Sequence, residues 1–294
     1  MPLISAWLRA IRIRFLLASV IAVSNGLAIA YWKYGLFDPA FAALTYAGVV
    51  FLHASVDLLN DYWDHKRGID SATTRTKFSG GTGVLPEKIL TPKAVYTAGI
   101  VFLLLGIAVG AYFVAIRGVT IAVILGFAVV AIYFYSTSIV NSGLGELFVA
   151  IKGAMIVLGT FYVQAALIEP AAIYVGAIVG LLSATVLFVN AFPDFEADRS
   201  KGRRTLVIVL GRQKASVLFP AFVIAAYCLI AIGIPLGYTK IYSLASLVSI
   251  PLALKAISAL RKDHDTTQGL VPAMGATVTY SRVTGFVLAA SLLF

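Results

Sequence analysis

Long apolar stretches separated by short polar breaks recur along the whole 294-residue chain. A helix needs about 20 residues to cross the hydrocarbon core of a bilayer, and each stretch is close to that length. Pro92, Pro170 and Pro272 fall in the breaks, where proline is expected to punctuate helices. The sequence therefore predicts an all-α, polytopic integral membrane protein with nine transmembrane helices around a central cavity, at residues 14–33, 39–60, 93–115, 119–136, 146–168, 171–193, 213–233, 238–258 and 273–294.

The composition excludes several other classes of protein. The chain is 60% hydrophobic and only 12% charged, whereas soluble domains carry about 25% charged residues. So little polar surface excludes a cytosolic enzyme and a disordered chain. A single cysteine, Cys228, excludes a disulfide scaffold. The net charge of +10 is not concentrated on a soluble domain, so we expect no nucleic-acid partner, and no feature predicts a protein partner.

The basic residues sort to one side of the predicted membrane. Most of them lie in the N-terminal segment and in the second, sixth and eighth breaks, whereas Lys33, Arg117 and Lys240 lie in the odd-numbered breaks. Because cytoplasmic loops carry the excess of Lys and Arg, the N-terminus is expected in the cytoplasm and, after nine spans, the C-terminus outside. Residues 2–13 mix apolar side chains with arginines and predict a short helix at the membrane surface.

Acidic residues gather in two clusters at span ends that the positive-inside rule places in the cytoplasm. The first cluster has Asp57, Asp61 and Asp64, spaced i, i+4 and i+7 on one helix face. The second has Asn190, Asp194 and Asp198, spaced i, i+4 and i+8, which also predicts one helix face. This weak internal repeat predicts a single transmembrane domain, 1–294, with two similar halves at about 1–140 and 141–294.

The two clusters together describe a site for a metal and a diphosphate. Carboxylates spaced i, i+4 repel each other unless cations neutralise them, and oxygen ligands without Cys or His favour Mg²⁺. Basic residues follow each cluster, and Lys and Arg bind phosphate oxygens. The predicted metal ligands are Asp57, Asp61, Asp64, Asp194 and Asp198. The predicted diphosphate-binding residues are Asn60, Arg67, Lys77, Asn190, Lys201, Arg203 and Arg204.

The motifs around these residues resemble a known family. NDYWD (60–64) followed by GID (68–70), and DFEAD (194–198) followed by RSKGRRT (199–205), resemble the two aspartate-rich motifs of the UbiA superfamily of intramembrane aromatic prenyltransferases. SGGTGVLP (79–86) and GLGELFV (143–149) are similar to the branch that prenylates dihydroxynaphthoate for menaquinone. The resemblance extends over most of the chain, and the family's fold also has nine spans.

The resemblance implies a prenyltransferase that moves a prenyl group from a polyprenyl diphosphate to an aromatic quinone precursor in the membrane. Two or more Mg²⁺ ions between the motifs, with Lys77 and Arg203, would stabilise the departing diphosphate. Aromatic faces would stabilise the allylic cation, and Tyr133, Tyr135 and Tyr162 are candidates. Asp61, Asp64, Asp194, Asp198, Tyr135 and Lys152 are the predicted catalytic residues.

Two other functions stay open from the sequence. Transfer of geranylgeranyl to geranylgeranylglyceryl phosphate, as in archaeal ether lipids, would use the same catalytic parts with a different acceptor pocket. A cation transporter would use the acidic faces as an ion path, with carboxylates near the middle of the bilayer and discontinuous helices.

Lys152 and Asp70 each allow more than one interpretation. Lys152 lies inside a predicted span, so it is either functional, paired with Glu146, or extended to the cytoplasmic face. Asp70 either contributes to the site or caps the loop. His53 is expected to be a hydrogen-bonded core residue, and the segment 61–92 is expected to be a long loop that could close over the site.

Overall fold

The computed structural model describes residues 3–70, 73–135 and 138–294, and all regular secondary structure in these ranges is helical. The helices are α1 (Leu3–Ala10), α2 (Ile13–Tyr34), α3 (Pro39–Lys66), α4 (Pro92–Arg117), α5 (Val119–Phe134), η1 (Ile139–Asn141), α6 (Gly145–Ala165), α7 (Pro170–Asn190), α8 (Phe195–Ser200), α9 (Leu206–Leu210), α10 (Arg212–Gly233), η2 (Ile241–Ser249), α11 (Ile250–Lys262) and α12 (Thr267–Ser291).

Each predicted span overlaps a helical segment of the described residues, and the all-α membrane fold is confirmed. Residue 136, the predicted end of the fourth span, lies outside the described residues. By length and apolar composition, seven helical segments of the described residues could cross a membrane: α2, α3, α4, α6, α7, α10 and the continuous segment Ile241–Lys262. α5 is apolar but has 16 residues, and α12 is long but carries Arg282 and many hydroxyl side chains. That α5 and α12 also cross the bilayer stays a prediction.

The predicted span at 238–258 is formed by two kinds of helix. Residues Ile241–Ser249 form a 3₁₀ helix, and α11 continues from Ile250. Pro251 occupies the first turn of α11, where its missing N–H leaves no intrahelical bond unmade. Proline therefore marks the change of helix type without ending the span.

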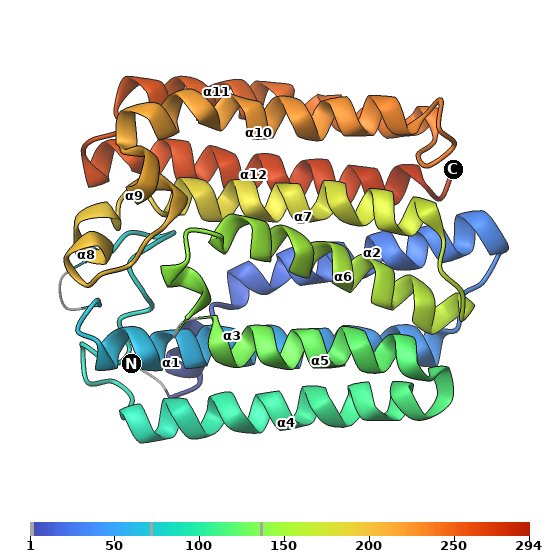
Figure 1. Ribbon diagram of the computed structural model, residues 1–294, viewed down its shortest axis with the longest axis horizontal. Coiled ribbons are helices and arrows are strands. Elements are labelled where there is room, and N and C mark those ends of the chain that lie inside the picture. Colours follow the sequence, from blue (N-terminus) through green and yellow to red (C-terminus); the bar gives the residue numbers. More distant parts are fainter. Residues whose placement is uncertain (1–2, 71–72, 136–137) are drawn as a thin grey trace.

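The long helices run side by side, and the segments outside them gather at one end of the bundle (Figure 1). α1, α8, α9 and the loop residues 67–70 and 73–91 lie at that end, and the C-terminus lies at the other. α2 is central, because it packs against α3, α6, α7 and α12. The backbones of α6 and α7 approach closely, since a Cβ on Gly180 would lie 2.0 Å from the Ala150 carbonyl oxygen. Small residues allow such contacts between membrane helices.

The short helix predicted in residues 2–13 exists as α1, and its location at the membrane surface stays a prediction. Its Leu3 and Ile4 side chains are 66% and 76% exposed, whereas Ala6 and Ala10 are buried against the bundle. Exposed apolar side chains on a short helix at the end of a membrane bundle are typical of a segment that lies in the headgroup region.

The structure corrects two local predictions about the acidic clusters. α3 continues to Lys66, beyond the predicted end of the span at 60, so the loop begins at 67 and is shorter than the predicted 61–92. Asp57, Asp61 and Asp64 lie together on α3, as predicted. The prediction that Asn190, Asp194 and Asp198 share one helix face is wrong, because α7 ends at Asn190 and Asp198 belongs to the separate helix α8. Pro193 explains the break, since it cannot donate to the Val189 carbonyl and its ring would clash with that oxygen.

Candidate active site

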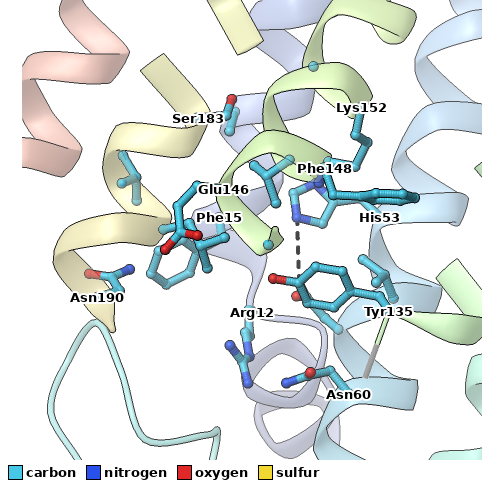
Figure 2. Close-up of a pocket in the computed structure, with 18 of the residues that line it drawn as sticks. Arg12, Phe15, His53, Asn60, Tyr135, Glu146, Phe148, Lys152, Ser183 and Asn190 are labelled. Carbon is cyan, nitrogen blue, oxygen red and sulfur yellow. Dashed lines mark ion pairs between the residues drawn. The ribbon is translucent and has the colours of Figure 1, made fainter. Parts of the chain in front are cut away.

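A cavity of about 370 Å³ lies inside the bundle. Its walls come from α2, α3, α5, α6, α7 and α12, and most of the exposed wall is apolar. Figure 2 shows Arg12 and Asn60 on one side of it, and His53, Phe148 and Lys152 grouped on the other. Asp61 and Asp64, which bond Arg12 and Asn60, therefore lie at one end of a largely apolar chamber, whereas Asp57 lies beside His53.

The first cluster is tied to two distant parts of the chain. An Nη of Arg12 donates to Asp61 Oδ1 at 2.6 Å, and the Thr82 hydroxyl donates to the other carboxylate oxygen of Asp61. Arg12 has a φ of +46°, a left-handed conformation uncommon outside glycine, at the turn between α1 and α2. This turn places the guanidinium group against α3.

Arg203 joins the two clusters. One Nη donates to Asp198 Oδ1 at 2.9 Å, and the other donates to Asp64. Asn60 also donates to Asp64, at 3.1 Å. Asp64 and Arg203 are 139 positions apart in sequence. The two aspartate-rich segments therefore meet at one place.

Three polar oxygens at the site lack a hydrogen-bond partner among the described residues. They are Asp57 Oδ2, Asn190 Oδ1 and Asp194 Oδ1, all buried. All three residues line the cavity. Because a buried acceptor without a partner is costly, such atoms are typical of a site that binds a ligand or an ion.

Burial raises the pKa of the acidic residues of the site that lie outside the membrane spans. The pKa of Asp194 is raised to about 7, first because burial removes its hydration and then because Asp198 repels its charge. The pKa of Asp70 is raised to about 8 by burial and by the charges of Asp61 and Asp64. Burial alone would lower the pKa of Arg203, but Asp64 and Asp198 more than offset this and raise it. The site thus concentrates negative charge in poor solvation.

Nine of the predicted site residues line the cavity: Asp57, Asn60, Asp64, Tyr135, Lys152, Asn190, Asp194, Asp198 and Arg203. The other five, Asp61, Arg67, Lys77, Lys201 and Arg204, do not form its walls. Asp61 lies behind the wall, bonded to Arg12 and Thr82. Lys77, Lys201 and Arg204 are exposed to solvent.

Asp70 is packed beneath the glycine-rich loop. A Cβ at Gly81 would lie 2.6 Å from Asp70 Oδ1, and Gly81 has a φ of +72°. Glycine is therefore required here both by backbone conformation and by contact. The loop brings Gly80 and Gly81 to the cavity wall, and the Gly80 N–H faces Asp194.

Sequence reasoning missed several residues of the site. Arg12 belongs to a basic segment that predicts orientation and a surface helix, and Thr82 belongs to SGGTGVLP, whose resemblance does not single out Thr82. Among the candidate tyrosines, Tyr135 lines the cavity, whereas Tyr133 and Tyr162 do not. Phe148 does line it, and its position four residues before Lys152 on a helix was the signal that could have found it.

The sequence matches the UbiA prenyltransferase family over residues 18–292. The chain belongs to this family. It is 27% identical to the 1,4-dihydroxy-2-naphthoate octaprenyltransferase of Escherichia coli, covering 88% of this chain and 86% of the relative. It is also 27% identical to the enzyme of the same name from Bacillus subtilis, covering 95% and 89% of the two chains.

A solved UbiA homolog from Archaeoglobus fulgidus, bound to DMAPP and Mg²⁺, has the same fold. Its TM-score is 0.67 at 17% identity, with 97% of this chain and 99% of that chain covered. Membership of the UbiA family makes this chain a multi-pass membrane prenyltransferase and confirms the resemblance inferred from the two motifs.

Proposed function

We propose that this chain transfers a prenyl group from a polyprenyl diphosphate to an aromatic quinone precursor within the membrane. The observation that carries the proposal is Arg203, which contacts Asp64 and Asp198 at one end of a largely apolar cavity. A diphosphate needs cations and hydrogen-bond donors, whereas its prenyl tail needs apolar walls. This cavity offers both in adjacent places.

The residues present fit Mg²⁺. In the described part of the chain no three His, Cys, Asp or Glu side chains converge on one point, and Arg12 and Arg203 pair with three of the carboxylates. Mg²⁺ in phosphate-processing sites usually takes one or two carboxylates and completes its shell with water and substrate phosphates. The unpartnered oxygens of Asp57 and Asp194 suit that pattern.

The five aspartates predicted as ligands, Asp57, Asp61, Asp64, Asp194 and Asp198, would hold two or more such ions. When bound, Mg²⁺ neutralises the diphosphate and makes it a better leaving group. Arg203 and Arg12 are positioned to donate hydrogen bonds to phosphate oxygens once the carboxylates engage cations. Asn60 and Asn190, at the same end, are the neutral groups proposed to orient the diphosphate.

The aromatic residues of the cavity are proposed to protect the reacting carbon. The ring faces of Tyr135 and Phe148 can stabilise an allylic cation, and apolar walls exclude the water that would capture it. The exposed basic residues Lys77, Lys201 and Arg204, together with Arg67, are proposed to attract the diphosphate from the aqueous side.

The acceptor is proposed from the relatives, because those from E. coli and B. subtilis act on 1,4-dihydroxy-2-naphthoate. The side of the membrane is proposed from the basic residues, with the N-terminus and both acidic clusters in the cytoplasm and the C-terminus outside. α1 and the C-terminus lie at opposite ends of the bundle, as this orientation requires.

A transfer assay in liposomes tests the proposal. Purified protein receives a polyprenyl diphosphate, Mg²⁺ and either 1,4-dihydroxy-2-naphthoate or geranylgeranylglyceryl phosphate. We expect a prenylated naphthalene product that disappears when a chelator removes the metal. Product from the glyceryl phosphate alone would favour the ether-lipid function, and cation flux without diphosphate cleavage would favour the transporter.

A further inference from the structure

Lys152 is an unusual residue for its location. It lies seven residues into α6, which is about 10 Å along the helix axis from the end where the acidic clusters meet. It lines the cavity, and among the described residues its ammonium group makes no hydrogen bond and no ion pair. The predicted pair with Glu146 is not formed. An unpaired charge at such a depth is unfavourable unless a ligand or a partner compensates it.

The nearest polar groups do not satisfy Lys152. His53 hydrogen-bonds the Ser19 hydroxyl through Nδ1 at 2.7 Å, and its Nε2 lies 3.7 Å from Asp57 Oδ2. Lys152 interacts electrostatically with both His53 and Asp57, but it forms an ion pair with neither. The 3.7 Å between His53 Nε2 and Asp57 Oδ2 is longer than a hydrogen bond, and neither residue forms an ion pair with Lys152. The ammonium of Lys152 therefore stays available in the cavity.

The position of Lys152 separates it from the diphosphate end. Figure 2 shows Lys152, His53 and Phe148 together on one side of the cavity, with Arg12 and Asn60 on the opposite side. Phe148 lies one helical turn before Lys152 on α6, and both residues line the cavity. A cation that shares a cavity with an aromatic ring and a hydrogen-bonded imidazole suits a flat ring that carries an anionic oxygen.

We propose that Lys152 determines acceptor specificity by binding an anionic oxygen, a carboxylate or an ionised hydroxyl, of the aromatic acceptor. The acceptor ring lies against Phe148, and the hydrogen-bonded pair Ser19 and His53 forms the polar wall beside it. This inference rests on the proposed function, because it names the acceptor's chemistry in the same cavity. It gives the cavity two anion sites, one for the donor and one for the acceptor.

Binding measurements on the purified protein in lipid nanodiscs test the assignment. The probes are 1,4-dihydroxy-2-naphthoate and 1,4-dihydroxynaphthalene, which differ by one carboxylate. Lys152→Met should raise the Kd of the naphthoate at least about tenfold, the size of a lost charge-assisted hydrogen bond. Lys152→Arg should recover most of the loss. Lys33→Met is the matched control, because Lys33 bonds the Gly237 carbonyl outside the cavity.

The two probes distinguish which oxygen is bound. If Lys152 binds the carboxylate, Lys152→Met raises the Kd of the naphthoate only. If it binds an ionised hydroxyl, the variant raises the Kd of both probes equally. Either result supports the proposal. The proposal is overturned if the variant binds both probes with the wild-type Kd or if the wild type binds neither probe. It is also overturned if the substitution instead raises the Kd of a non-hydrolysable prenyl diphosphate analogue.

The proposed function is tested separately. It fails if the wild-type protein, given Mg²⁺, never transfers a prenyl group to any aromatic acceptor. That result does not depend on the Kd ratio of the two probes, which reports on Lys152 alone.

Discussion

The two acidic clusters meet at one site but are built differently. The first lies on the continuous helix α3, and its Asp61 is held by Arg12 and Thr82, which come from separate segments. The second lies where α7 breaks at Pro193, and its Asp198 is held by Arg203, five residues later in its own segment. The first is therefore fixed by contacts between distant segments and the second by local contacts, with Arg203 joining them.

This difference has a consequence for the carboxylates. Asp61 has ion-pair and hydroxyl partners, whereas Asp194 keeps a buried oxygen without a partner among the described residues. A carboxylate with partners contributes to folding as well as to chemistry. A buried carboxylate oxygen without a partner, such as Asp194 Oδ1, is unfavourable for folding and is typical of an atom that binds a ligand or an ion.

The largest expected effect separates these two aspartates. Asp194→Asn should lower kcat about 100-fold or more, because a charge that positions the metal and diphosphate is removed. Its stability should stay within about 1 kcal/mol of wild type, since no ion pair is lost. Transfer assays and thermal unfolding in detergent measure the two quantities.

Asp61→Asn is the contrasting variant. It should lose activity to a similar degree and also about 3 kcal/mol of stability, because Arg12 is left without its partner. Equal stability losses in the two variants would contradict the distinction between the clusters.

The junction between the clusters gives the next effect. Arg203→Met leaves Asp64 and Asp198 without their shared cation, so the metal-free protein should be less stable by about 3 kcal/mol. Mg²⁺ can then neutralise both carboxylates without competition. The increase in Tm on adding Mg²⁺ should therefore be larger in the variant than in the wild type. A smaller increase would mean that Arg203 assists metal binding.

The pH dependence of Mg²⁺ binding sharpens the comparison further. Asp194 and Asp70, with pKa values of about 7 and 8, hold protons that a cation must displace. Affinity for Mg²⁺ should rise with pH between 6 and 8, by up to about tenfold per unit for each proton released. Calorimetric titrations at several pH values measure this. Asp70→Asn should remove the part of the rise near pH 8. If the dependence of Mg²⁺ affinity on pH is unchanged in this variant, Asp70 does not release a proton when Mg²⁺ binds.

Without metal, the free energy of unfolding should change with pH in the direction opposite to that of the Mg²⁺ affinity. The folded pKa of Asp194 lies above its unfolded value of 3.8, so the native state binds more protons than the unfolded chain between about pH 4 and 7. The free energy of unfolding should therefore decrease as pH rises through this window. Thermal unfolding in a chelator checks the sign.

The sequence predicted what depends on composition and local spacing. Apolar length located the helices, and carboxylates next to basic residues pointed to the two segments that meet at the candidate site. It did not predict that Arg203 would bridge from the second cluster to Asp64 or that Arg12 would reach Asp61, because such contacts depend on how helices pack. The prediction that Asn190, Asp194 and Asp198 share one helix face overlooked Pro193, which breaks the second helix. The proposal of two similar halves therefore rests on charge placement and not on matching local structure.

The smallest effect concerns the loop that completes the first cluster. Glu87 accepts hydrogen bonds from Arg9 and from Arg75, and Arg9 also donates to the Thr82 carbonyl at 2.6 Å. These bonds hold the segment from which Thr82 reaches Asp61. Glu87→Gln keeps the shape but removes the charge, so trypsin should cleave after Lys77 and Lys88 about two- to fivefold faster. Glu196→Gln is the matched control, because Glu196 is exposed and pairs with Arg212 in the second cluster's segment.

The pH profile of this cleavage provides a separate check on the loop. The hydrogen bonds from Arg9, and then those from Arg75, lower the pKa of Glu87 to about 2. Its contribution is therefore complete above the unfolded value of 4.5 and is lost as pH falls towards 2. Protease sensitivity of the loop should be constant from pH 5 to 8 and should increase below that range, measured with a protease active in acid. Increased cleavage already near pH 7 would instead indicate that Asp70 and Asp194, with their raised pKa values, hold the loop in place.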